Sequence, residues 1–143
     1  MDNILVSACL LGVSCRYDGQ SRPNENVIAL KDKYNMIPVC PEIMGGLPTP
    51  RLPSEIVNGR VVMENGKDVT MEYQRGAFET LRLAGLFGCR KAVLKEKSPS
   101  CGCGKIYDGT FSRKLVQGNG ITAQLLLENG IEVLGESSII DNI

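Results

Sequence analysis

Three of the six cysteines follow short apolar runs that are typical of buried β-strands. The runs and their cysteines are Ile4-Leu5-Val6 with Cys9, Met36-Ile37-Pro38-Val39 with Cys40, and Ala92-Val93-Leu94 with Cys101. Parallel α/β sheets bind their ligands at the edge where the carboxyl ends of the strands meet. Chain breakers beside these cysteines, such as Pro41 and Gly102, leave backbone amides free to face a sulfur or an anion. We therefore expect Cys9, Cys40 and Cys101 to converge on one inorganic centre at that edge.

Thiols without histidine limit the chemistry that such a centre can support. The chain has no histidine, which removes His-based general bases, Cys-His nucleophile pairs and mixed Cys/His zinc sites. A structural zinc site takes four protein ligands, and Cys101-x-Cys103 is not the usual closely spaced pair. An iron–sulfur cluster accepts distant thiolates, and with three of them one iron stays open as a Lewis acid for a soft atom such as sulfur. The spacing alone leaves an open cluster, a catalytic zinc ion and a redox disulfide as alternatives.

A carboxylate and two hydroxyls stand close enough in sequence to reach this centre. Glu42 lies two residues after Cys40 and is a candidate acid–base group, or equally a salt-bridged surface carboxylate. Ser98 and Ser100 stand just before Cys101. Either hydroxyl can donate to a bound anion or relay a proton, and the alternative is a turn hydroxyl that caps local backbone.

The long loop and the segment after the first strand add basic and aromatic candidates. Arg51 is a candidate clamp for an anionic or carbonyl ligand, because its guanidinium presents a fork of donors. The alternative is an ion pair with Glu55. We expect Arg16, Tyr17 and Asp18 to line the rim of the site.

The elements that must position these residues alternate between strand and helix. Strands are predicted at residues 3–8, 36–39, 91–95 and 131–134, and helices at about 25–33, 69–87 and 122–128. Right-handed crossovers between such elements give an α/β fold with a small, mostly parallel Rossmann-like sheet covered by helices. A β-hairpin insertion is predicted at residues 56–63, around the two-residue turn Asn58-Gly59. We expect residues 1–143 to form a single domain, because no repeat or composition shift divides them.

Caps and chain breakers make the predicted elements more specific. Asn24 is a predicted N-cap for the first helix and Asp68 for the long helix, while Pro38 suggests that its strand lies at or near a sheet edge. Prolines and glycines exclude helix from residues 40–55, and residues 106–111 are predicted as a turn. The long helix carries these apolar positions: Phe78, Leu81, Leu83, Leu86 and Phe87.

The amino-acid composition limits which classes of protein this chain can belong to. The 143 residues carry 16 basic and 16 acidic side chains, so nothing favours a nucleic-acid partner. No apolar run approaches the roughly 20 residues that cross a membrane, and no signal peptide is visible. We therefore expect a cytoplasmic protein whose thiols are free or metal-bound rather than paired in disulfides. Cys89, before the third strand, is predicted to be a small buried side chain.

The motifs taken together resemble the bacterial stand-alone domain-of-unknown-function family that includes the 2-thiouracil desulfurases. They are Ser7-Ala8-Cys9-Leu10-Leu11-Gly12, Cys15-Arg16-Tyr17-Asp18-Gly19, Cys40-Pro41-Glu42, Gly45-Gly46-Leu47-Pro48-Thr49-Pro50-Arg51, Ser98-Pro99-Ser100-Cys101-Gly102 and Tyr107-Asp108-Gly109-Thr110-Phe111. The resemblance implies a desulfidase-like domain with a [4Fe-4S] cluster on Cys9, Cys40 and Cys101 and one open iron. It also implies catalytic roles for Glu42 and Ser100. Cys15 lies in a matching motif and is the alternative ligand.

The implied reaction is a non-redox desulfuration of a thiolated nucleobase such as 2-thiouracil. The open iron polarises the C–S bond, water activated by Glu42 or Ser100 attacks the carbon, and uracil and hydrogen sulfide are released. Arg51 and Ser98 are the expected substrate-binding residues. The expected partner is this small molecule, with no nucleic acid and no membrane.

Three competing interpretations also fit these motifs. The same cluster could serve an iron–sulfur sensing or sulfide-carrying module that has no catalytic turnover. Cys101 and Cys103 could form the disulfide of a thiol redox protein that needs no iron. A zinc hydrolase is the weakest alternative, because no conventional four-ligand set is visible.

Overall fold

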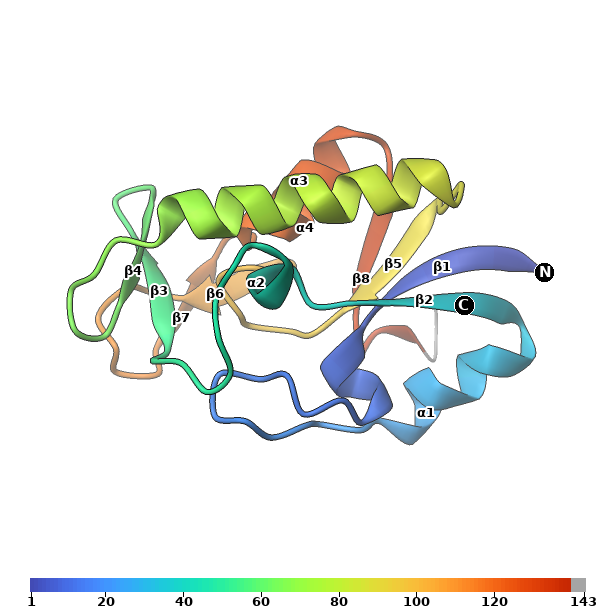
Figure 1. Cartoon of the computed structure of the whole chain (residues 1–143), viewed down its shortest axis with the longest axis horizontal. Helices are drawn as coiled ribbons and strands as arrows, with labels where there is room; N and C mark the ends of the chain where they lie inside the picture. Colours follow the sequence, from blue (N-terminus) through green and yellow to red (C-terminus); the bar gives the residue numbers. More distant parts are fainter. Residues whose placement is uncertain (140–143) are drawn as a thin grey trace.

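The computed structural model describes residues 1–139, which contain both strands and helices (Figure 1). In order they are β1 (Asp2–Ser7), η1 (Ala8–Leu11), α1 (Glu25–Ile28), η2 (Ala29–Asp32), β2 (Tyr34–Val39), α2 (Pro41–Met44), β3 (Ser54–Val57), β4 (Arg60–Met63), α3 (Thr70–Leu86), β5 (Lys91–Leu94), β6 (Lys105–Tyr107), β7 (Leu115–Gln117), α4 (Ile121–Glu128) and β8 (Glu132–Gly135). The prefix η marks a 3₁₀ helix. In the part of the chain described here, no helix is long and apolar enough to cross a membrane.

The central sheet has four parallel strands in the order β2-β1-β5-β8. The register places Ser7 beside Val39 and Leu5 beside Ala92, so the carboxyl ends of β1, β2 and β5 lie at one edge. The strand that contains Pro38 is at the border of the sheet, where a missing amide donor is tolerated. The predicted α/β fold and its parallel sheet are confirmed, and each of the four predicted strands is present.

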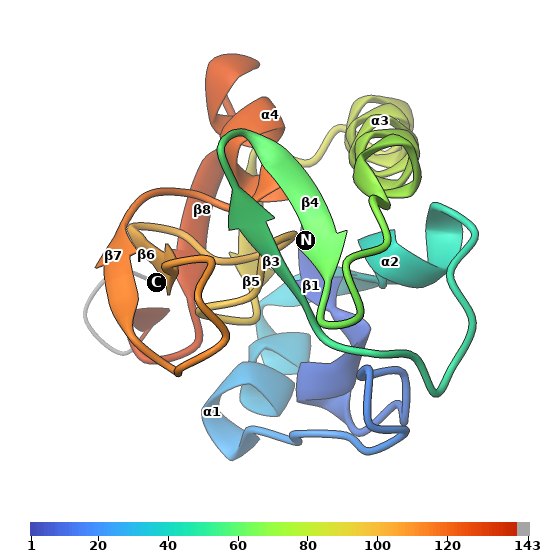
Figure 2. The same ribbon diagram turned by 90° about the vertical axis from the view of Figure 1, so that its left-hand side faces the viewer.

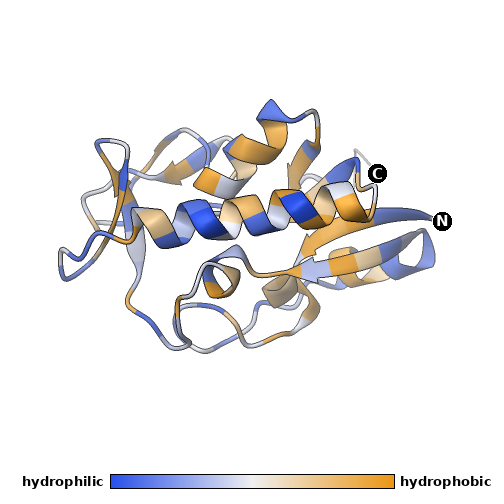
Figure 3. Cartoon of the chain, turned by 45° about the horizontal axis from the view of Figure 1, so that its top comes forward, coloured by the Kyte–Doolittle hydropathy of each residue, from blue (hydrophilic) through white to orange (hydrophobic). Residues whose placement is uncertain are grey.

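Helices cover the two faces of this sheet, with α3 and α4 on one side and α1 on the other (Figures 1 and 2). Alternation along β1 explains the layers, because Leu5 packs with the α3 and α4 side while Ile4 and Val6 pack with the α1 side. In Figure 3 the strands between the helices are largely hydrophobic. Near-continuous apolar runs of this kind are what a sheet covered on both faces requires.

The long helix α3 buries mostly small side chains, together with Tyr73, and only part of the predicted apolar set. Three of the five predicted apolar positions, Phe78, Leu86 and Phe87, are exposed, whereas Leu81 and Leu83 are partly buried against the core. The buried positions are Thr70, Tyr73, Gly76, Ala77, Thr80 and Ala84. The reason is the close packing of α2, since a Cβ atom added to Gly76 would lie 1.9 Å from the carbonyl oxygen of Pro41.

Two sequence-based predictions in the loops are wrong. Residues 40–55 contain the one-turn helix α2, which Pro41 permits because a proline at the first helical position needs no amide donor. Residues 105–117 form a second hairpin from β6 and β7, whereas only a turn and a polar segment were predicted. The predicted hairpin at β3 and β4 is confirmed. Both hairpins lie beyond the carboxyl ends of the central strands (Figure 1).

The predicted caps have different outcomes. Asn24 caps α1 as predicted, since its side-chain oxygen accepts a 3.1 Å hydrogen bond from the amide of Val27. The N-cap residue of α3 is Val69 rather than Asp68. Asp68 still satisfies an amide at that end, because its Oδ1 accepts a 2.9 Å hydrogen bond from the nitrogen of Thr70.

Candidate functional site

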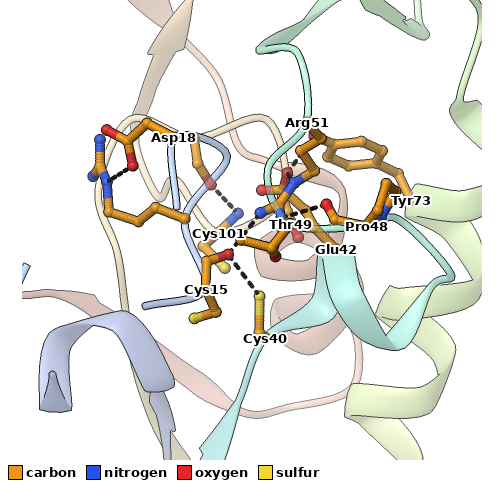
Figure 4. Close-up of polar contacts among 12 residues, drawn as sticks. Cys15, Asp18, Cys40, Glu42, Pro48, Thr49, Arg51, Tyr73 and Cys101 are labelled. Carbon is orange, nitrogen blue, oxygen red and sulfur yellow. Dashed lines mark hydrogen bonds and ion pairs between the residues drawn. The ribbon is translucent and has the colours of Figure 1, made fainter. Parts of the chain in front are cut away.

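A cavity of about 520 Å³ opens at the carboxyl edge of the central sheet. Its lining includes Cys9, Cys40 and Cys101, the three cysteines expected to converge, together with Cys15 from the loop after η1. Figure 4 shows Cys15, Cys40 and Cys101 gathered beside Glu42 and Arg51. The structure thus brings all three predicted thiol ligands and a fourth thiol to one place.

Local structure explains how each of the predicted thiols reaches this place. Cys9 lies in η1, which starts directly after β1 and ends at Gly12 with a φ of 102°. Cys40 lies between β2 and α2, at the N-cap position of that helix. Cys101 follows β5 through a tight turn in which its amide donates a 2.7 Å hydrogen bond to the Ser98 hydroxyl oxygen. The thiols therefore come from the ends of three adjacent strands.

Burial and mutual contact raise the pKa of three of these thiols, those of Cys15, Cys40 and Cys101. Burial raises the pKa of Cys101 to about 12. The hydrogen bond with Cys15 is the largest cause that raises the pKa of Cys40, and burial adds to it. The contact with Cys40 lowers the pKa of Cys15, but contact with Cys9 and burial raise it more. Each thiol must lose its proton when its sulfur binds a metal, so metal binding by these cysteines would release protons.

Ser7 ties the end of β1 to the thiol of Cys101. The Ser7 hydroxyl is 3% exposed and donates to the Cys101 sulfur over 3.7 Å. The same oxygen accepts a 2.9 Å hydrogen bond from the amide of Lys95, just past β5. Sequence reasoning gave Ser7 no role, although a hydroxyl at the end of a strand two residues before Cys9 was a usable signal.

Glu42 is held between a cation and a phenol. Its Oε1 accepts a 3.0 Å hydrogen bond from Arg51 Nε and a 2.8 Å hydrogen bond from the Tyr73 hydroxyl (Figure 4). The Arg51 side chain is 3% exposed and that of Glu42 is 16% exposed, so this ion pair is largely shielded from water. Burial would lower the pKa of Arg51, but the charge of Glu42 raises it further above its ordinary value. The cavity therefore holds a charged pair with fixed geometry.

Most of the N–H groups of the Arg51 guanidinium donate hydrogen bonds to other atoms of the protein. Its Nη1 donates to the Pro48 carbonyl at 3.2 Å and to Thr49 Oγ1 at 3.1 Å, and its Nη2 donates to the Cys15 carbonyl at 2.9 Å. The alternative of an ion pair with Glu55 is wrong, because the carboxylate beside Arg51 is that of Glu42. The guanidinium lines the cavity and also locks the surrounding loops in place.

The structure places the two serines of the Ser-Pro-Ser segment differently. Ser98 lines the cavity. Ser100 is 1% exposed, shares a 2.9 Å hydrogen bond with the Thr122 hydroxyl of α4, and is not among the lining residues. Of the two hydroxyls, Ser98 is therefore the one that a ligand in the cavity can meet directly.

The two remaining cysteines lie outside the cavity. The Cys103 thiol donates to the Val133 carbonyl over 3.6 Å and packs against the core, so it faces β8. This placement does not favour a redox pair between Cys101 and Cys103. Cys89 is 5% exposed within the core cluster, as expected of a small buried side chain.

The rim contains Arg16 and Tyr17, as expected, but Asp18 is not among the lining residues. The Arg16 guanidinium lies 5.5 Å from the centre of the Tyr17 ring and its Nε 3.6 Å from an oxygen of Asp18. Sequence reasoning also missed Tyr73, whose hydroxyl reaches Glu42 from α3. Helical spacing from Val69, Tyr73 and Gly76 along one face could have indicated that it points inward.

The donor set fits a multi-iron cluster better than a single ion. Among residues 1–139, no three Cys, Asp or Glu side chains are grouped closely enough to hold one metal ion. Four soft thiols from separate loops nevertheless face the same cavity. Thiolates that stand apart around a common space are the ligands that a cluster takes, because its irons and sulfides fill the distance between them.

Comparisons with known proteins agree with this geometry. The family described as 2-thiouracil desulfurase matches residues 4–138. An uncharacterised protein of Bacillus subtilis (strain 168), YbbK, is 43% identical over an alignment that covers 96% of this chain and 98% of that protein. A solved structure of the [4Fe-4S]-dependent thiouracil desulfidase TudS superposes with a TM-score of 0.93 at 46% identity, covering 99% of this chain and 95% of that one.

Proposed function

The chain belongs to the 2-thiouracil desulfurase family, and from this premise we propose that it removes the sulfur of a thiolated nucleobase such as 2-thiouracil. The observation that carries the proposal is the cavity in which Cys9, Cys40 and Cys101 stand beside the fixed carboxylate of Glu42. The reaction is a hydrolysis in which the thiocarbonyl and one water give uracil and hydrogen sulfide. No electrons are exchanged, so neither an oxidant nor a reductant is required.

Cys9, Cys40 and Cys101 are the proposed ligands of a [4Fe-4S] cluster. Their positions at the ends of three adjacent strands, around one cavity, support this set. When bound, a cluster with three protein ligands supplies an open iron, a Lewis acid with affinity for sulfur. The hydroxyl of Ser7 then serves as a hydrogen-bond donor to one ligand sulfur. Cys15, which contacts Cys9 and Cys40, is the alternative ligand.

Glu42 is the proposed general base for the attacking water. Arg51 and Tyr73 both bind Oε1, and within residues 1–139 the other oxygen, Oε2, accepts no hydrogen bond from the protein. The two donors fix the carboxylate so that Oε2 can take a proton from water as its oxygen attacks the thiocarbonyl carbon. Arg51 is accordingly a positioning residue for Glu42 rather than a direct clamp on the substrate.

A hydroxyl beside the third thiol completes the proposed site. Ser98 is at the cavity wall and can donate to the substrate or pass a proton to the departing sulfur. Ser100 remains the residue that the family resemblance suggests. Its hydrogen bond to Thr122 supports an indirect role, in which it holds the turn that carries Cys101.

The first experiment is anaerobic reconstitution with iron and sulfide, followed by a count of both and an assay with 2-thiouracil. About four irons per chain, with equal release of uracil and sulfide, is the expected result. Cys9→Ser, Cys40→Ser and Cys101→Ser should each lower the iron content, whereas Cys89→Ser and Cys103→Ser should retain it. Full iron content and turnover in any of the first three variants would contradict the proposed ligand set.

Glu42→Gln tests the base. The amide keeps the shape of the side chain but cannot accept the water proton, so kcat should fall by about 10²–10⁴-fold while the iron content stays unchanged. The matched control is Glu79→Gln, an exposed position of α3 outside the cavity. Wild-type turnover in a cluster-loaded Glu42→Gln enzyme would refute the assignment.

A further inference from the structure

The Tyr107-Asp108-Gly109-Thr110-Phe111 segment has no part in the chemistry proposed above. It runs from the end of β6 into the connection to β7, and both Tyr107 and Phe111 line the cavity. A segment that contributes side chains to the cavity wall, yet supplies no thiol or acid–base group, is a candidate for holding the substrate.

The backbone of this segment is in an unusual conformation. Four residues other than glycine have positive φ angles among residues 1–139, namely Asn58, Lys97, Phe111 and Arg113. Asn58 stands in the β3–β4 turn, where asparagine tolerates that region, and the other three all line the cavity. A φ of 56° is costly for a bulky aromatic residue such as Phe111. Strained residues of this kind persist where the surrounding structure fixes them, and they concentrate at functional sites.

A buried carboxylate fixes the strained turn. Oε1 of Glu55, a residue that is 8% exposed, accepts a 2.9 Å hydrogen bond from the amide of Gly109 and a 3.1 Å hydrogen bond from the amide of Phe111. Glu55 forms no ion pair in the described part of the chain. Its carboxylate is therefore used to hold two amides of residues 108–112 against β3.

The turn is also held by its own side chains and by close packing. Asp108 Oδ1 accepts a 2.9 Å hydrogen bond from the amide of Thr110 and a 2.6 Å hydrogen bond from its hydroxyl. A Cβ atom added to Gly109 would lie 2.7 Å from the carbonyl oxygen of Ile56, so only glycine allows the turn to approach β3 this closely. These contacts fix the backbone from which the Phe111 side chain projects.

The other aromatic side chains of the cavity either make other contacts, lie at the rim or belong to an unstrained strand. Tyr73 is 2% exposed and donates to Glu42, and Tyr17 lies at the rim beside the Arg16 guanidinium. Tyr107 belongs to β6, whose ladder with β7 fixes its backbone without strain. Phe111 offers neither donor nor acceptor in its side chain, so its contribution to a cavity whose wall mixes polar and apolar residues is an aromatic face.

We propose that residues 108–112 hold Phe111 as a platform on which the flat ring of the substrate stacks, and that Glu55 positions this platform. The proposal rests on the proposed function, because a thiolated pyrimidine is the planar ligand in question. Stacking between a base and an aromatic side chain tolerates different bases, since every base has a π-face. The polar residues of the wall are then left to recognise the edge of the ring and its sulfur.

The first test compares steady-state kinetics of cluster-loaded variants with 2-thiouracil. Phe111→Leu keeps an apolar side chain without the aromatic face and should raise KM about tenfold or more with a much smaller change in kcat. Phe111→Tyr should keep KM near the wild-type value. Phe78→Leu is the matched control, because Phe78 is 63% exposed on α3 and lies outside the cavity.

A second test measures ligand binding by fluorescence in the absence of turnover. The chain contains no tryptophan, so Phe111→Trp places a single indole at the platform. Titration of this cluster-loaded variant with uracil, the proposed product, should quench its fluorescence in a saturable way. In the same background, adding Glu55→Ala should weaken the affinity for uracil, whereas Glu55→Gln, which keeps an oxygen acceptor for both amides, should restore it.

An unchanged KM in Phe111→Leu, or no quenching of the Phe111→Trp variant by saturating uracil or 2-thiouracil, would overturn the platform. These results differ from failure of the proposed function, in which the cluster-loaded wild type itself would release no sulfide from 2-thiouracil. In that case the fluorescence titration with 2-thiouracil still decides between a stacked base and an empty platform.

Discussion

The largest stability effect that we predict comes from Arg51→Met. This substitution removes the cation beside Glu42 and keeps a long apolar side chain in the space it occupied. The wild-type ion pair has a separation of 3.0 Å, and Arg51 also donates to the Pro48 carbonyl, Thr49 Oγ1 and the Cys15 carbonyl. Because the Arg51 side chain is 3% exposed, water cannot replace these contacts unless the loops move.

The size of the expected loss in unfolding free energy follows from the burial of this ion pair. Removing one partner of a buried ion pair strands the other charge and costs about 3–5 kcal/mol. That is a large part of the roughly 5–15 kcal/mol by which a domain is stable. Arg51→Lys keeps the charge but loses the planar fork that reaches several acceptors at once, so its cost should be intermediate.

Urea unfolding of the cluster-free protein at pH 7, under reducing and anaerobic conditions, measures these differences. The matched control is Arg60→Met, which breaks an ion pair with Asp68 that is shorter, at 2.8 Å. In that pair the side chains are 58% and 45% exposed, so water solvates the remaining charge and the unfolding midpoint should barely change.

Two results would contradict the predicted role of burial in the Arg51–Glu42 ion pair. One is an Arg51→Met midpoint no lower than that of Arg60→Met, which would mean that burial does not decide the strength of the pair. The other concerns the double variant Arg51→Met/Glu42→Gln, in which no carboxylate is left without an opposite charge beside it. It should recover part of the lost stability, and strictly additive losses would show that Arg51 and Glu42 are not coupled.

Two further predictions concern packing and pH. Gly76→Ala should destabilise the fold by about 1–3 kcal/mol and lower activity, because its Cβ would lie 1.9 Å from the Pro41 carbonyl oxygen next to Glu42. Gly85→Ala in the same helix meets nothing within 4 Å and should stabilise the protein by about 0.5–1 kcal/mol, as thermal unfolding of both can show. Burial would raise the pKa of Glu96, but hydrogen bonds from the Ser137 hydroxyl and amide lower it more. This depressed pKa contributes stability that is present above the ordinary value of 4.5 and is lost as the pH falls. Urea midpoints of Glu96→Gln should therefore depend less on pH in the acid range than those of the wild type, and equal slopes would contradict this.

The strands, turns and caps that depend on residues close together in the sequence were predicted correctly where the apolar pattern matches the burial seen in the fold. The buried strands are continuous apolar runs, and the Asn58-Gly59 turn and the Asn24 cap act over a few residues. The buried face of α3 was predicted only in part, because hydrophobicity does not reveal that α2 packs closely against Gly76. The second hairpin was missed, because its strands have three residues each and no clear alternation.

Residue types and their spacing establish which chemistry is available. Cysteines at three predicted strand ends, a glutamate beside one of them and the absence of histidine indicate a thiolate-held centre. The role of each side chain depends on the three-dimensional arrangement. Ser98 faces the cavity while Ser100 turns to Thr122, and Tyr73 and Ser7 join the site through hydrogen bonds to residues far away in the chain. The physical reason is that residue type fixes what a side chain can donate, accept or bind, whereas its direction depends on packing between elements that are distant in the sequence.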